Sequence, residues 1–310
     1  MKRPALALVA LVLVATVAGC GFGAGKKSGG SVSVTVSTDF GRARLAPTSR
    51  KSAREGETVM RLLQRSFDVT TRFGGNFVQE IDGVSGGRED GRRVDWFYYV
   101  NGIESSTGAG ERKLFPGDRV WWDHHDWESA MRVPAVVGAF PEPFRSGQDG
   151  KKLPIRLVCL RPQEGRSCDE VEKRLLNAGV PNVARSNLES SPGQVLRILV
   201  GPWSDVRKDI AARQLEEGPS VSGVFAKPSP NGAQITLMDP DGKSERTLGP
   251  GSGLVAATSY QEDHPTWMIT GTDDVGVAAA AAALTEDQLR YHFALAIDAG
   301  RGVPLPLEGP

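Results

Sequence analysis

Residues 94–102 read VDWFYYVNG, and residues 119–124 read RVWWDH. Both segments are dense in aromatic and β-branched residues, which favour strands. Asn101-Gly102 is the strongest short signal for a two-residue hairpin turn. The two segments therefore predict strands around a tight turn, in a part of the chain that is mainly β.

The segments on the N-terminal side extend this prediction to a small module. SVSVTVS at residues 31–37 alternates polar and apolar side chains, which is typical of a half-buried strand. ETVMRLLQRSF at 57–67 has apolar residues at helical spacing, and FVQEI at 77–81 favours a strand. We therefore expect a β-rich domain with one helix over residues 32–130.

The aromatic strand near residue 122 has two faces, because successive side chains of a strand point to opposite sides. One face carries Val120, Trp122, His124 and Asp126, and the other carries Trp121, Asp123, His125 and Trp127. We expect one face to pack on the helix that contains Leu62. The other would then expose aromatics with a histidine and carboxylates, a pattern that marks ligand or partner surfaces. In the alternative reading, the tryptophans build the core of the module.

A second region follows a stretch rich in proline and glycine. Residues 131–150 contain Pro134, Pro141 and Pro143 and predict a linker. Beyond it, strands and helices alternate, which predicts an α/β sandwich over residues 151–310. The helices are expected at 168–178 with Ser167 as cap, at 204–217, after the cap Thr272-Asp273-Asp274, and from Thr285 to about Ala299. The predicted fold class is α+β, with two domains as the length of 310 residues suggests.

The N-terminus has the pattern of a secretory signal. Residues 1–19 open with Lys2 and Arg3, run apolar for about a dozen residues, and are too short to span a bilayer. Ala18-Gly19 directly before Cys20 resembles the bacterial lipobox, which implies cleavage before Cys20 and its lipidation with acyl chains such as palmitate. The alternative is an ordinary secretory signal. Residues 20–31 are rich in glycine and predict a flexible tether on the extracytoplasmic face of the cell membrane.

Charge and cysteine content narrow the function further. The chain has 37 basic and 37 acidic residues, so binding of nucleic acid through bulk positive charge is not expected. Once Cys20 is acylated, Cys159 and Cys168 remain in an oxidising compartment. This pair predicts a disulfide that closes a short loop, with two free thiols as the alternative.

One set of motifs resembles a known family. WFYYVNG at 96–102, Gly108, and LFPGDRVWW at 114–122 resemble the transcobalamin-like C-terminal (DUF4430-type) domain, over about residues 32–127. The resemblance implies a β-grasp-like module. In the vitamin B12 carriers this module forms one half of a clamp around the corrinoid, so the resemblance also implies a corrinoid-like ligand. The other half of that clamp, an α/α barrel, has no counterpart in the second region.

The residues with candidate roles in ligand contact are Trp96, Tyr98, Asn101, Trp122 and His124. The aromatics would stack on the ligand, and His124 would serve as a polar or axial ligand. A metal site is not expected, because the adjacent His124 and His125 diverge on a strand and zinc needs three or four converging ligands.

These observations lead to a hypothesis with two alternatives. The leading hypothesis is a membrane-anchored binding lipoprotein with no cofactor of its own. It would capture a corrinoid-like or other small ligand, or dock onto an uptake system. The second is a structural or protein-interaction lipoprotein of the envelope without a small ligand. An enzyme housed in residues 151–310 is a third reading. It is not expected, because HExxH and SxxK are absent and no set of His and acidic residues marks a catalytic site.

Overall fold

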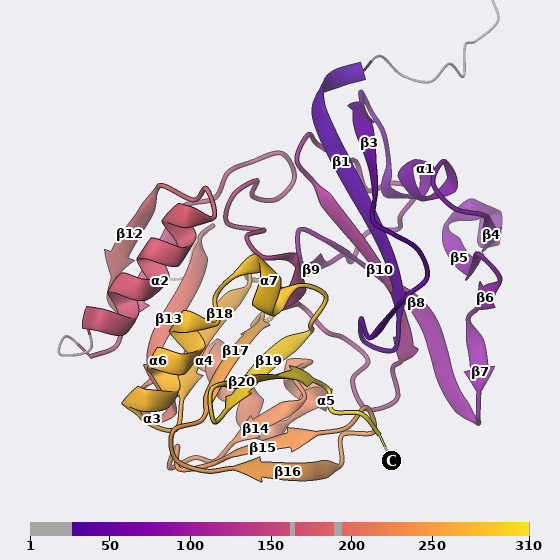
Figure 1. Cartoon of the computed structure of the whole chain (residues 1–310). Helices are drawn as coiled ribbons and strands as arrows, with labels where there is room; N and C mark the ends of the chain where they lie inside the picture. The colour runs from indigo at the N-terminus through magenta and orange to yellow at the C-terminus, as the bar shows by residue number, and fades with distance from the viewer. Residues whose placement is uncertain (1–26, 162–164, 189–193, 310) are drawn as a thin grey trace, which may run out of the picture.

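The computed structural model describes residues 27–161, 165–188 and 194–309 (Figure 1). The predicted signal peptide, Cys20 and most of the predicted tether lie outside these residues. Strands and helices form two regions built on separate sheets, which confirms the α+β class. Within the described ranges, none of the helices is both long and apolar enough to cross a membrane.

The first region contains a mixed sheet of seven strands. They are β1 (Lys27–Thr38), β2 (Ala43–Arg44), β3 (Ser49–Arg54), β7 (Gly87–Glu89), β8 (Arg92–Val100), β9 (Ile103–Glu104) and β10 (Arg119–Asp126). Their order is β2-β1-β10-β8-β7, with β3 also paired to β1 and β9 to β8. Strands β1 and β10 run parallel. Asn101 and Gly102 have φ values of 55° and 77° and form the predicted tight turn between β8 and β9.

One face of this sheet packs on the helix predicted near Leu62. Helix α1 (Val59–Gln64) begins at Thr58, whose hydroxyl accepts a hydrogen bond from the backbone N–H of Arg61. The apolar side chains of the alternating β1 segment enter the same core as Leu62 and Trp122. A small sheet extends this core, and it consists of β4 (Val69–Arg72), β5 (Phe77–Ile81) and β6 (Val84–Ser85), with the short turn η1 (Phe73–Gly75) between the first two.

The second region is a seven-stranded mixed sheet with covered faces. Its strands are β11 (Ile155–Cys159), β12 (Val183–Ser186), β13 (Leu196–Pro202), β17 (Gly253–Thr258), β18 (Thr266–Gly271), β19 (Ala294–Asp298) and β20 (Arg301–Leu305), in the order β12-β11-β13-β18-β17-β19-β20. Helices α2 (Gly165–Asn177) and α6 (Asp274–Ala282) share a core with one face. The other face packs on α3 (Trp203–Val206), α4 (Ile210–Arg213), η4 (Gln214–Glu217), β14 (Ala226–Pro228), β15 (Ile235–Met238) and β16 (Ser244–Leu248). The short elements η2 (Val137–Ala139), α5 (Pro219–Ser222) and α7 (Glu286–Leu289) complete the fold.

Several predicted helix boundaries need correction. Ser167 lies inside α2, which begins at Gly165, so Ser167 is not its cap. The helix predicted over 204–217 is broken into three short pieces, because Asp209 caps α4 by accepting hydrogen bonds from Ala211 and Ala212. The last helix ends at Leu289 instead of near Ala299, and the apolar run 294–298 is the buried strand β19. The predicted cap Asp273 is confirmed, since its carboxylate accepts the N–H of Gly276 at 2.9 Å.

The two regions share one hydrophobic core. Tyr99 and Trp121 of the first sheet, and Phe40 of the loop between β1 and β2, pack in the same cluster as Phe225 and Phe293 of the second region. The prediction that this sheet face is exposed is therefore wrong: large aromatic side chains on both sides are removed from water together. The stretch 131–150, predicted as a linker, contributes buried side chains to both cores of the second region.

A buried carboxylate organises this junction. Asp123 is fully buried, and its two oxygens accept hydrogen bonds from the backbone N–H groups of Phe40 (3.0 Å) and Gly41 (2.8 Å). The Ser37 hydroxyl (2.5 Å) and His125 Nδ1 (2.8 Å) complete its partners, so the histidine carries its proton on Nδ1. Phe40 is thereby held with its ring 5.1 and 5.2 Å from the rings of Phe225 and Phe293.

The predicted disulfide between Cys159 and Cys168 is present, with Cα atoms 6.1 Å apart. It joins the end of β11 to the first turn of α2. The bond therefore ties a helix of the second region to the sheet that the helix covers.

We predict that Phe40→Ala lowers the free energy of unfolding by about 3–5 kcal/mol, the usual cost of deleting a buried aromatic ring. The matched control is Phe73→Ala, because Phe73 is 82% exposed, and it should cost under about 0.5 kcal/mol. Denaturant titration of both variants measures the difference. Equal losses for the two phenylalanines would contradict the role given to Phe40.

Candidate functional site

The structure places the aromatic residues with predicted ligand roles together, in the core of the first region. Trp96 and Tyr98 on β8 pair with His124 and Trp122 on β10. Trp96, Tyr98 and Trp122 are only 6%, 8% and 2% exposed, under α1 and the small sheet. These side chains therefore build the core, as the alternative reading of the tryptophans expected.

Asn101 and His124 have structural partners. The fully buried Asn101 amide donates to Asp118 Oδ1 and to the Gly147 carbonyl, each at 2.9 Å. His124 Nε2 lies 3.2 Å from the Ser85 carbonyl, and burial lowers the pKa of this histidine. His124 does line a hollow of about 650 Å³. In the part of the chain that the structure describes, no cluster of three or more His, Cys, Asp or Glu side chains is placed to hold a metal ion.

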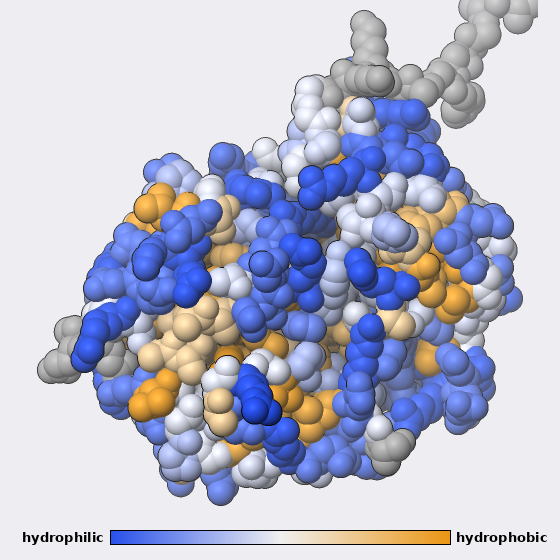
Figure 2. Space-filling view, viewed as in Figure 1, coloured by the Kyte–Doolittle hydropathy of each residue, from blue (hydrophilic) through white to orange (hydrophobic). Residues whose placement is uncertain are grey.

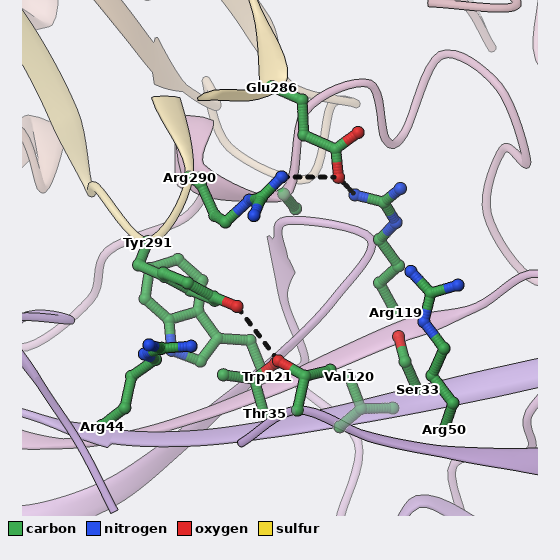
Figure 3. A pocket seen from close by; sticks show the side chains of 13 residues that line it. Ser33, Thr35, Arg44, Arg50, Arg119, Val120, Trp121, Glu286, Arg290 and Tyr291 are labelled. Carbon is green, nitrogen blue, oxygen red and sulfur yellow. Dashed lines mark hydrogen bonds and ion pairs between the residues drawn. The ribbon is translucent and has the colours of Figure 1, made fainter. Parts of the chain in front are cut away.

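A different hollow lies at the junction of the two regions, with a volume of about 260 Å³. Its walls come from β1, β2, β3 and β10 of the first sheet, from η2, and from α7 and the residues just after it (Figure 3). Four arginines line it: Arg44, Arg50, Arg119 and Arg290. We call this hollow the arginine pocket.

The register of the first sheet sets two of these arginines on either side of a small residue. Ser33 on β1 pairs with Arg50 on β3 and with Arg119 on β10. Paired residues of neighbouring strands project on the same face, so the three side chains form a row. Strands are about 4.8 Å apart, which puts the two arginine backbones about 10 Å from each other. The serine therefore leaves space between two long cationic side chains.

The next row on this face supplies hydroxyl groups. Thr35 pairs with Trp121 on β10, and its hydroxyl lies 2.9 Å from that of Thr48. The Thr48 hydroxyl is in turn 3.0 Å from the hydroxyl of Tyr291. These groups can donate or accept hydrogen bonds to a bound molecule beside the arginines.

The arginines outnumber the acidic side chains of the pocket. Glu286 accepts a hydrogen bond from Arg119 at 2.9 Å and lies 3.8 Å from Arg290 (Figure 3). Arg290 also donates to Asp287 at 3.3 Å, outside the lining of the pocket. Arg44 lies over the ring of Tyr291, 5.0 Å from its centroid. Arg50 has no ion-pair partner among the described residues. Four arginines and one glutamate give the lining a formal charge of +3.

Guanidinium groups in such an arrangement suit carboxylates and phosphates, because their planar donors can form two parallel hydrogen bonds to these anions. A cleft lined by one sign of charge also concentrates its field and attracts the oppositely charged ligand. The pocket is therefore built to attract and orient an anionic group.

The segment GVSGG at 83–87 has the GxSxG form of a hydrolase nucleophile elbow. Such an elbow needs a strand, a sharp turn and then a helix. Ser85 instead lies on β6 of an antiparallel hairpin, and its hydroxyl donates to Glu80. The pattern here is that of a hairpin turn.

The sequence prediction missed the pocket residues. They come from distant segments, and an isolated arginine is ordinary on a protein surface. The available signal was the polar half of SVSVTVS, whose Ser33 and Thr35 face the pocket while Val32 and Val34 face the core.

The buried His124 and the partly buried His264 and His292 predict how stability depends on pH. Burial lowers the pKa of His124, His264 and His292 from 6.5, so the unfolded chain takes up protons at a higher pH than the folded chain. Unfolding free energy should fall as pH drops through about 6.5, until the lowered folded pKa values are passed. His292→Gln should reduce this fall, as denaturant titrations at pH 7.5 and 5.5 would show. An unchanged dependence in that variant would contradict the assignment for His292.

Comparison with known proteins covers part of the chain. Residues 56–126 match the family model DUF4430, a domain of unknown function. No curated protein matches the chain. The crystal structure of a candidate metal-binding protein from Ruminococcus gnavus is similar over 31% of this chain and 97% of its own, at 15% identity and a TM-score of 0.26. This chain thus contains a DUF4430 domain at residues 56–126.

Proposed function

We propose that the protein is a lipid-anchored extracytoplasmic binding protein, and that its ligand is a small molecule with an anionic group held in the arginine pocket. The observation that carries the proposal is the row Arg50–Ser33–Arg119, which places two guanidinium groups about a small gap. Arg44 and Arg290 add positive charge from the other walls of the same hollow. The proposal is one of binding and includes no catalytic step.

The anchor rests on the sequence Ala18-Gly19-Cys20. Lys27, where β1 begins, is seven residues after Cys20. Seven residues span at most about 25 Å, so an anchored protein would hold the start of β1 close to the membrane. Two acyl chains on one anchor are enough for stable attachment to a membrane.

Corrinoid capture is the more specific proposal that follows from the transcobalamin-like resemblance. The strand order β3-β1-β10-β8 around α1, with β1 and β10 parallel, supports a β-grasp-like module. Of the five predicted contact residues, however, only His124 lines a described hollow, and its Nε2 atom already contacts the Ser85 carbonyl. Binding of an anion in the arginine pocket therefore has better support than corrinoid capture. Corrinoids are tested beside the anions in the experiment below.

We predict that the protein from Lys27 onward binds inorganic phosphate or citrate by calorimetry, with an affinity that falls as salt is raised. Arg50→Gln should weaken binding about 10- to 100-fold, because it removes a charge-assisted hydrogen bond worth about 1.5–3 kcal/mol. The matched control is Arg93→Gln on β8, outside the pocket, which should bind as the unchanged protein does.

Four results would count against this proposal. If neither anion binds, or if Arg50→Gln and Arg93→Gln lose affinity equally, the arginine pocket is not the site. If cobalamin or cobinamide binds and His124→Ala abolishes it, corrinoid capture replaces anion binding. If none of these compounds binds, the protein-interaction alternative becomes the better account.

The anchor has its own test. In a bacterial host that processes lipoproteins, Cys20→Ser should leave the protein unlipidated. Less of the variant than of the unchanged protein should then be recovered in the membrane fraction, from which detergent extracts the unchanged protein. Metabolic labelling with a tagged fatty acid should mark the unchanged protein and not the variant. Labelling that persists in Cys20→Ser would contradict lipidation at this residue.

A further inference from the structure

A second hollow adjoins the arginine pocket. Its volume is about 670 Å³, and it shares Arg44, Arg290 and Tyr291 with the first. These three residues therefore stand at the boundary between the two spaces. The guanidinium of Arg44 lies over the ring of Tyr291 there. Both side chains have a polar end and an apolar body, so they can contact polar groups on one side and apolar groups on the other.

The lining changes character across this boundary. The arginine pocket is walled largely by guanidinium and hydroxyl groups. The second hollow has Phe40 and the C-terminal segment Val303–Leu307 as its apolar wall, and its other side is polar, with Arg42, His292 and Glu308 beside the three shared residues. Val303 and Leu307 are partly buried against the shared core. Figure 2 shows hydrophilic side chains over the middle of this face and apolar ones lower down, toward the C-terminus. A molecule that fills both spaces would meet the arginines at one end, and at the other it could lie along the apolar wall of Phe40 and Val303–Leu307.

We propose that the ligand is a single-chain amphiphile with an anionic head, whose head lies in the arginine pocket and whose hydrocarbon tail lies in the second hollow. This inference rests on the proposed function and names the class of its ligand. Charge complementarity selects the head, and the apolar wall of the adjacent hollow, which shares three lining residues with the arginine pocket, selects the tail. A small polar anion would leave the second hollow unused, and a polyanion would meet apolar side chains there.

The positions of the arginines around the two hollows support an amphiphile with one anionic head for a further reason. Arg42 at the second hollow is already held by Asp39 at 2.8 Å and by the Pro306 carbonyl at 2.7 Å. Of the cations that line the second hollow, Arg42 is thus neutralised, and Arg44 and Arg290 are shared with the arginine pocket. Arg50, which has no ion-pair partner among the described residues, lines the arginine pocket and not the second hollow. The charge therefore favours one anchoring point for the anion at the arginine end.

The test compares three probes by calorimetry on the protein from Lys27 onward, which contains every described strand and helix. Dodecyl phosphate below its micelle concentration carries head and tail, inorganic phosphate carries the head alone, and dodecyl maltoside carries the tail with a neutral head. Each buried methylene strengthens binding about fourfold, so about four of them suffice for a hundredfold gain. We expect dodecyl phosphate to bind at least a hundredfold more tightly than phosphate and than dodecyl maltoside.

Variants separate the two ends of the site. Leu307→Gln should weaken dodecyl phosphate at least tenfold and leave phosphate binding unchanged, whereas Arg50→Gln should weaken both. Val303→Thr keeps the side-chain volume and serves as a second tail variant if Leu307→Gln does not fold. Leu176→Gln on α2 is the control, since Leu176 is 59% exposed and remote from both hollows.

The outcomes distinguish this inference from the function on which it rests. Phosphate binding with no gain from the dodecyl chain would keep the anion site and overturn the amphiphile. Dodecyl maltoside binding as tightly as dodecyl phosphate would show a tail site without a head site and overturn the proposal as stated. If neither phosphate nor dodecyl phosphate binds, the proposed function and the inference fail together.

Discussion

The buried carboxylate of Asp123 is the interaction on which the arrangement of this protein depends. It lies on β10 in the middle of the first sheet and is fully shielded from water. Four donors satisfy it, and two of them are backbone N–H groups of the loop that carries Phe40. Asp39, Phe40 and Gly41 all have positive φ, a conformation that needs such fixed partners. The carboxylate thus holds the loop that fastens the first sheet to the second region.

The junction formed in this way explains how one sheet provides a core and a candidate site. Alternation along β1 sends valines under α1 and small hydroxyl residues to the other face. Part of that second face is filled by aromatic packing with Phe293, just before β19, and the remainder, near Ser33, is left open between arginines. The pocket therefore exists only where the two regions meet, since Glu286, Arg290 and Tyr291 close its other side. A ligand in this position would contact both regions at once.

Local features of the fold could be predicted from the sequence, and long-range ones could not. The Asn101-Gly102 turn, the helix near Leu62, the Asp273 cap and the Cys159–Cys168 bond depend on neighbouring residues or on cysteine pairing, and each was predicted correctly. The final helix was extended too far, because the apolar run 294–298 fits a buried helix or a buried strand equally well until its neighbours β17 and β20 are known. The covered face of β10 and the arginine pocket depend on the packing of segments over 150 residues apart, for which periodicity carries no information.

Hydrogen exchange measured by mass spectrometry in Asp123→Ala tests this account most directly. If the carboxylate holds the two regions together, the variant should exchange faster in β8 and β10 and also in β19, whose Phe293 neighbour packs on Phe40. Asp39→Asn is the matched control, because Asp39 lies in the same loop and is 54% exposed. Faster exchange confined to the first region, with β19 as protected as in the unchanged protein, would contradict the account.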